Sequence, residues 1–240
     1  MIIDIQQSRL LVISDLHVGN PYSQAGRALG AFFDYATRER FNVCISGDGF
    51  EILQASLSAI ASDSVDVMNR IRTHLDAGLK VYYVVGNHDI VLENFLSNWV
   101  GLEITPFVNL TSGEVRVRIE HGHLYDPSFV QSPVCYEMLT RLAGPFLRLY
   151  PDVYRLWAYY EEVKTWLGGL LSRKPRQCVY HEAAQMLLTR GFDAVVFGHT
   201  HRPERVEFGP RRLYINSGNW VRGGSYVEIL EGRLSLKQWR

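Results

Sequence analysis

The chain has 240 residues, of which 47% are hydrophobic and 21% are charged, the composition of an ordinary globular protein with a sizeable core. Its 25 Lys and Arg residues equal its 25 Asp and Glu residues, and this neutral balance argues against the basic surface of a nucleic-acid-binding protein. Three widely spaced cysteines, no secretion signal and no run of about 18 apolar residues favour a cytoplasmic location and exclude a membrane-spanning protein.

Short apolar runs alternate with longer segments of helical character, which predicts an α/β fold with largely parallel strands. Helical segments at 24–40 and 56–77 separate the first three runs and are long enough to be crossover helices. We therefore expect the first three strands to pair in one sheet. The five predicted strands are Leu10–Ser14, Val43–Ser46, Val81–Val85, Val115–Glu120 and Ala194–Phe197.

The fourth run, Val115–Glu120, alternates strictly between apolar and polar residues. This pattern indicates a strand with one buried face and predicts a second, more mixed sheet. Four C-terminal segments, separated by Gly-rich turns, are expected to complete this second sheet as antiparallel strands. They are Val206–Phe208, Arg212–Asn216, Tyr226–Leu230 and Leu234–Trp239.

A stretch at about 131–176 is rich in Leu, Tyr, Trp and Arg, with apolar residues at helical steps of three and four. It predicts a helical cap inserted into one domain that spans residues 1–240. In one interpretation the apolar stripe only packs on the core. In the other it lines a groove for an acylated substrate or contacts the inner face of a membrane.

Each of the five predicted strands ends directly in a cluster of side chains that can bind metals. Ligands of an open α/β sheet gather at the carboxyl ends of its strands, so these clusters should converge on one edge. Six of the eight histidines lie in them. The motifs are Asp15-Leu16-His17, Gly47-Asp48, Gly86-Asn87-His88-Asp89, His121-Gly122-His123 and Gly198-His199-Thr200-His201.

The donor chemistry indicates two transition-metal ions. A mixture of imidazole nitrogens with carboxylate and amide oxygens suits Mn, Fe or Zn better than Ca. A shared carboxylate can hold two such ions about 3.5–4 Å apart, a spacing that clamps the attacking and leaving oxygens at phosphorus. Asp48 is the candidate for the shared ligand.

The order of these motifs resembles the calcineurin-like metallophosphoesterase superfamily, from about Leu10 to Trp220. The resemblance implies a four-layer α/β/β/α sandwich and a hydrolase in which a hydroxide bridging two divalent ions, with Mn as first choice, attacks phosphorus. It also implies that His88 is a catalytic acid and not a ligand. The ligands implied for one ion are Asp15, His17, Asp48 and His201, and those for the other are Asp48, Asn87, His121 and His199.

Three neighbouring residues have less defined roles. His123 is interpreted as a support for other ligands or as a ligand itself, so it stays outside the predicted set. Glu51 could tune a neighbouring ligand, but a helix-start carboxylate is the preferred interpretation. Asp89 or another carboxylate is expected to orient His88.

The helical insertion and the Gly47-Asp48-x-x-Glu51 pattern also resemble UDP-2,3-diacylglucosamine hydrolases, which cleave a pyrophosphate in a lipid A precursor and release UMP. The chain has His88 where those enzymes typically have Arg, and His123 where they have Asp. An alkoxide leaving group needs an acid more than a phosphate does, so His88 favours ester cleavage. The expected substrate is a phosphate ester, either lipid-linked or small and soluble, and the oligomeric state stays open.

Overall fold

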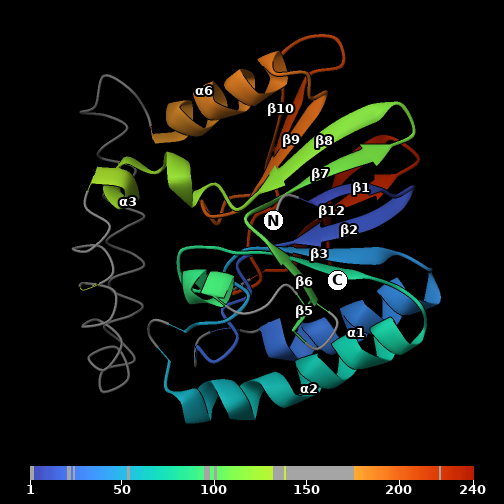
Figure 1. Cartoon of the computed structure of the whole chain (residues 1–240), viewed down its shortest axis with the longest axis vertical. Coiled ribbons are helices and arrows are strands. Elements are labelled where there is room, and N and C mark those ends of the chain that lie inside the picture. Colours follow the sequence, from blue (N-terminus) through green and yellow to red (C-terminus); the bar gives the residue numbers. More distant parts are fainter. Residues whose placement is uncertain are drawn as a thin grey trace.

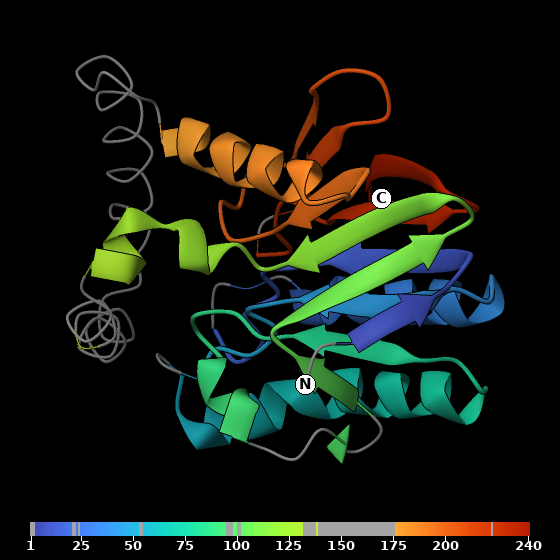
Figure 2. The same ribbon diagram turned by 45° about the horizontal axis from the view of Figure 1, so that its top comes forward.

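The molecule is a sandwich of four layers in the computed structural model (Figure 1). Two β-sheets face each other; α6 (Arg176–Thr189) covers one, and α1 (Ala25–Arg38) and α2 (Leu57–Asp76) cover the other. The turned view in Figure 2 shows the same layers, which confirms the predicted α/β/β/α architecture. The residues that the structure describes are 3–20, 23, 25–52, 55–94, 98–99, 102–131, 138, 176–221 and 223–240.

The first sheet has seven strands within the described residues, in the order β13-β12-β2-β3-β4-β6-β5. Its central strands β2, β3 and β4 are parallel neighbours, as predicted for the first three runs. The crossover helices α1 and α2 connect them, and the Ser56 side chain caps α2 by accepting a hydrogen bond from Ala59 N. The strands are β2 (Arg9–Ile13), β3 (Asn42–Ser46), β4 (Val81–Val84), β5 (Asn98–Trp99), β6 (Leu102–Thr105), β12 (Ser225–Leu230) and β13 (Arg233–Gln238).

The second sheet has six strands in the described part of the chain, in the order β1-β7-β8-β9-β11-β10. Its strands β8 and β9 are parallel and match the fourth and fifth predicted runs. The sheet is mixed, as expected, because β7 and β8 form an antiparallel hairpin. The strands are β1 (Ile3–Gln6), β7 (Phe107–Ser112), β8 (Val115–Glu120), β9 (Ala194–Phe197), β10 (Glu204–Glu207) and β11 (Leu213–Asn216).

The prediction for the four C-terminal strands is wrong in two respects. Only β10 and β11 join the second sheet, and β11 runs parallel to β9. The other two, β12 and β13, join the first sheet, where β12 is antiparallel to β2. The reason is packing: Val227 and Ile229 of β12 lie between the sheets, whereas Tyr226 packs on the side of α1 with Phe32. A strand buried on both faces belongs inside a sheet.

Apolar side chains fill the spaces between the layers. The cluster between the sheets contains Val12 and Tyr82 from one sheet and Val117 and Val196 from the other. Burial of such side chains contributes about 1.5–3 kcal/mol each, so this layer holds the two sheets in a fixed relation. Strand ends from both sheets are thereby kept close together.

The predicted helical insertion at about 131–176 lies almost entirely outside the described residues, so the insertion and the domain boundaries remain predictions. Just before it, η2 (His123–Tyr125) and α3 (Pro127–Gln131) follow β8. Within the described ranges, none of the helices combines the length and the apolar character needed to cross a membrane.

Candidate metal centre

The loops that follow β2, β3, β8 and β9 are joined to one another by backbone hydrogen bonds. Asp15 N donates to Gly47 O at 3.1 Å and His17 N donates to Asp48 O at 2.9 Å, which ties the first motif to the second. Gly198 N donates to His121 O at 3.0 Å, which ties the fifth motif to the fourth. His199 N donates to Asp15 Oδ2 at 3.1 Å, so motifs from both sheets meet on one side of the sandwich, as predicted.

These loops hold their polar residues in an unusual backbone conformation. Eight non-glycine residues of the described ranges have positive φ, and five of them are predicted ligands. Such a conformation costs about 1–3 kcal/mol per residue and concentrates at functional sites. The five have φ between 47° and 65°: Asp15, His17, Asp48, His199 and His201.

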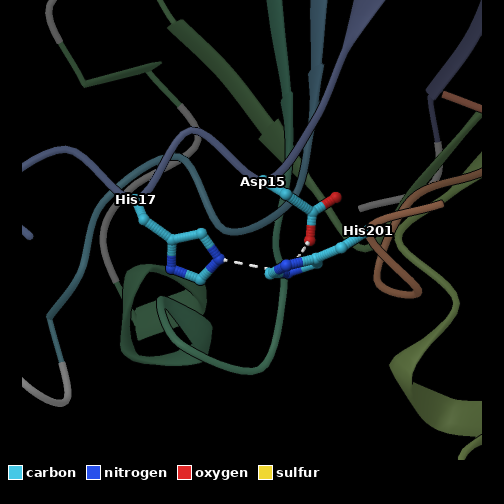
Figure 3. Close-up of side chains that lie close together, drawn as sticks. All are labelled: Asp15, His17 and His201. Atoms are coloured by element: carbon cyan, nitrogen blue, oxygen red, sulfur yellow. Dashed lines mark hydrogen bonds and ion pairs between the residues drawn. The ribbon is translucent and has the colours of Figure 1, made fainter. Parts of the chain in front are cut away.

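The first group of candidate ligands is formed by Asp15, His17 and His201, whose potential ligand atoms lie within 4.8 Å of one another. Figure 3 shows the three side chains pointing toward one another, with His201 coming from the loop after β9. His201 Nε2 lies 3.0 Å from Asp15 Oδ1 and 3.4 Å from His17 Nε2. Asp15 and His17 are buried, whereas His201 is exposed.

The second group is formed by Asp48, His121 and His199, again within 4.8 Å. His121 Nε2 lies 3.2 Å from Asp48 Oδ2 and 3.2 Å from Asn87 Oδ1, so the predicted amide ligand joins this group. Asp48 Oδ2 also lies 3.9 Å from His17 Nε2 in the first group. Asp48 thus stands between the two groups, where a shared ligand is needed.

The protonation pattern of His121 favours a cation at the second group. Its Nδ1 lies 2.9 Å from the Ser46 carbonyl oxygen, which can only accept, so Nδ1 carries a hydrogen. Its Nε2 then faces the oxygens of Asp48 and Asn87, neither of which can donate. Burial alone would lower the pKa of His121, but Asp48 raises it to about 9. Three electron-rich atoms that converge in this way require a cation or a proton between them.

The carboxylates are also suited to cation binding. Asp15 Oδ1 is buried and forms no hydrogen bond with any described residue, despite its closeness to His201. Burial alone would raise the pKa of Asp15, but the neighbouring His201 lowers it to about 2. Burial acts in the same direction on Asp48, but the charges of His121 and His88 hold its pKa well below the usual value. Both groups are ionised at neutral pH, and the residues present fit two metal ions.

One supporting residue of this centre, Asp126, was not predicted from the sequence. Its Oδ2 lies 3.1 Å from Nε2 of His199, and Tyr180 OH donates to the same oxygen at 3.4 Å. A hydrogen on Nε2 leaves Nδ1 of His199 free for the second group. The signal that could have found it is an acidic residue directly after a ligand motif, in the segment His121–Asp126.

The structure corrects the preferred interpretation of Glu51. This residue lies in the loop before α2, and its carboxylate is buried between two imidazoles, so it is not a helix-start carboxylate. Its Oε2 lies 2.7 Å from His17 Nδ1 and its Oε1 lies 2.6 Å from His88 Nδ1. The carboxylate that orients His88 is therefore Glu51. Asp89 instead accepts hydrogen bonds from Gly49 N, Gly86 N and Tyr83 OH. These bonds connect the loop after β3 to the loop after β4.

His123 lies beside the centre and belongs to none of the candidate groups among the described residues. Its ring centroid is 5.5 Å from that of His121 and 6.5 Å from that of His199, and it packs edge-on against Phe129. Burial and the neighbouring His121 and His199 lower its pKa to about 3, so the ring is neutral. This position is consistent with a supporting role.

A glycine makes room for the shared carboxylate. A Cβ atom on Gly86 would lie 2.1 Å from Asp48 Oδ1 and 2.5 Å from Asp48 N. We expect Gly86→Ala to displace Asp48 and to lower metal affinity and phosphoester hydrolysis about a hundredfold, since misplacement by 1 Å can cost that much. The matched control is Gly26→Ala in α1, where an added Cβ meets no atom within 4 Å. Equal metal affinity and activity in both variants would contradict this expectation.

Comparisons with known proteins agree with this geometry. A sequence model of the calcineurin-like phosphoesterases matches residues 8–203, which contain all five motifs. The chain is 25% identical to a UDP-2,3-diacylglucosamine hydrolase of Shewanella sp. (strain W3-18-1), over 95% of this chain and 96% of that protein. It is 23% identical to a hydrolase of the same name from Psychromonas ingrahamii, over 95% and 96%. A dimetal phosphatase from Danio rerio shares the fold, with a TM-score of 0.50, 13% identity and coverage of 96% and 95%.

Proposed function

The chain belongs to the calcineurin-like phosphoesterase family and is a metal-dependent phosphoesterase, and we propose that it hydrolyses a phosphoester or pyrophosphate bond with two divalent cations. The family implies a dimetal centre, and Asp48 supports one because it forms two candidate ligand groups, one with His121 and His199 and one with His17 and His88. The observation that carries the proposal is the convergence of acceptor atoms around Asp48 Oδ2. The Nε2 atoms of His17 and His121 approach it from opposite groups.

The proposed ligand set follows from these contacts. When bound, the two cations supply an activated water and neutralise charge at phosphorus. Mn is the first choice and Fe or Zn are alternatives, because the donors combine imidazole with carboxylate and amide oxygens. One ion would be held by Asp15, His17, Asp48 and His201, and the other by Asp48, Asn87, His121 and His199.

His88 is the proposed proton donor to the leaving oxygen. Burial alone would lower the pKa of His88, but Glu51 and Asp48 raise it to about 10. The contact with Glu51 therefore favours the protonated form of the ring. General acids of this kind contribute about 10²–10⁴ in rate. The backbone N of His88 also donates to Asp48 Oδ1 at 2.9 Å, which holds the ring next to the shared carboxylate.

The first candidate substrate is UDP-2,3-diacylglucosamine or a similar lipid-linked nucleotide sugar. It is supported by the relatives of that name, which match over 95% of this chain at 25% identity or less. Such a substrate would be met in the cytoplasm at the inner face of a membrane, with the segment at about 131–176 as the proposed contact. The second candidate is a small soluble phosphodiester or phosphomonoester, which the presence of His88 favours because an alkoxide leaving group needs a proton donor.

A substrate panel separates the two candidates. The Mn-loaded protein is incubated with UDP-2,3-diacylglucosamine, bis(p-nitrophenyl) phosphate and p-nitrophenyl phosphate, and product formation is followed. Release of UMP at a kcat/KM well above that for both simple esters is the expected result. A preference for a simple ester would favour the second candidate. No cleavage of any of the three would contradict the proposed hydrolase.

A further inference from the structure

The Glu51 carboxylate contacts the imidazole ring of a proposed metal ligand and that of the proposed proton donor, each through a separate oxygen. Oε2 accepts from His17 Nδ1 at 2.7 Å, and Oε1 accepts from His88 Nδ1 at 2.6 Å. The two rings meet edge to face, with centroids 4.8 Å apart. The Glu51 side chain is only 2% exposed, so water does not compete for these bonds.

The backbone around Glu51 fixes this arrangement. Glu51 N donates to Val18 O at 3.0 Å, and Val18 N donates to Gly49 O at 2.9 Å. Val18 follows His17 directly, so the loop that carries Glu51 is attached to the loop that carries His17. A bridge between Val18 and Phe50 adds to this attachment. These backbone contacts therefore fix the position from which the Glu51 side chain reaches both rings.

A buried carboxylate in this position determines which nitrogen of each ring carries a hydrogen. A carboxylate accepts and does not donate, so Nδ1 of both His17 and His88 must be the donor. His17 then presents the lone pair of Nε2 to the first group, where Nε2 lies 3.4 Å from His201 Nε2 and 3.9 Å from Asp48 Oδ2. In His88 the same contact leaves Nε2 as the remaining nitrogen for proton transfer.

We propose that Glu51 is a positioning residue that couples the first metal group to the proton donor, by holding His17 in its metal-binding tautomer and His88 in its proton-donating orientation. The inference rests on the proposed function, because the orientation of His88 matters only if an ester is hydrolysed. One carboxylate that serves both rings makes metal binding and leaving-group protonation depend on the same residue.

The test is the variant Glu51→Gln, which keeps the shape but replaces one acceptor by an NH₂ donor. The amide can accept from only one ring, and its donor forces the other ring to present a lone pair at Nδ1. The first readout is Mn²⁺ titration by calorimetry. Loss of such an outer partner typically weakens metal affinity about 10–100-fold, and we expect this at one of the two sites. The matched control is Glu228→Gln, a buried carboxylate on β12 that accepts from Lys237 Nζ at 2.7 Å.

The second readout is the dependence of kcat on the leaving group, across aryl methyl phosphodiesters whose phenols span a range of pKa. The loss of kcat in Glu51→Gln relative to the wild type should grow as the leaving phenol becomes more basic. A merely structural defect would lower kcat equally for all phenols. Unchanged Mn²⁺ affinity at both sites together with a uniform loss of rate would overturn the proposal. If the Gln variant does not fold, Glu51→Asp, whose shorter side chain cannot reach both rings, takes its place. If the wild type cleaves neither an ester nor UDP-2,3-diacylglucosamine, the proposed function fails, but the Mn²⁺ titration still tests the contact with His17.

Discussion

Replacing Asp48 by Asn is expected to lower phosphoester hydrolysis at least about a thousandfold, because the variant loses the only carboxylate placed between the two proposed metal groups in the described structure. Asp48 Oδ1 accepts from His88 N at 2.9 Å, and its Oδ2 faces His17 and His121. If the Asn oxygen keeps the bond to His88 N, its NH₂ group points at the metals. The variant therefore removes a negative charge and also presents a donor to the cations.

Metal analysis distinguishes this explanation from a general loss of structure. Asp48→Asn should bind fewer than two equivalents of Mn²⁺ at concentrations that saturate the wild type. The control is Asp34→Asn, an exposed aspartate of α1 that pairs with Arg70 at 2.8 Å. Its metal content and kcat should equal those of the wild type, since surface ion pairs contribute little. An Asp48→Asn protein with two bound metals and wild-type activity would remove Asp48 from the centre.

The second large effect is expected for His88→Ala with poor leaving groups. Without the protonated ring, kcat for an alkyl phosphodiester should fall about 10²–10⁴-fold, the usual contribution of a general acid. For p-nitrophenyl esters the loss should be much smaller, because p-nitrophenolate leaves without a proton. Metal content should be retained, since Asp15, Asp48 and His121 keep their positions.

Because both kinds of ester are measured with the same preparation of one variant, the comparison does not depend on the fraction of protein that is correctly folded. The matched control is His181→Ala, which removes a histidine of α6 that pairs with Glu204 of β10 at 3.1 Å and is in none of the candidate ligand groups of the described residues. That variant should lose activity equally, if at all, with both leaving groups. A His88→Ala enzyme that is equally impaired on alkyl and p-nitrophenyl esters would indicate that His88 only supports the site.

The sequence was sufficient to predict the parts of the site that follow from local patterns. Each predicted ligand comes directly after an apolar strand, and strand bounds such as Val115–Glu120 and Ala194–Phe197 agree with the structure. Parallel strands end on a common side, so convergence of the motifs required no knowledge of side-chain packing.

The parts that could not be predicted depend on contacts between distant segments. Glu51 is 34 positions from His17 and Asp126 is 73 positions from His199, so the sequence shows an acidic residue near a ligand motif in each case but not the imidazole that it contacts. Similarly, the apolar character of β12 predicts a buried strand but not the sheet that it joins. The faces of β12 are covered by the second sheet and by α1, and β12 reaches this position by pairing with β2.

The most direct measurement is anomalous X-ray diffraction from crystals soaked in Mn²⁺. We expect two peaks about 3.5–4 Å apart, both in contact with the Asp48 carboxylate. Asp15, His17 and His201 should surround one peak, and Asn87, His121 and His199 the other. A single peak, or two peaks that do not share Asp48, would contradict the proposed centre.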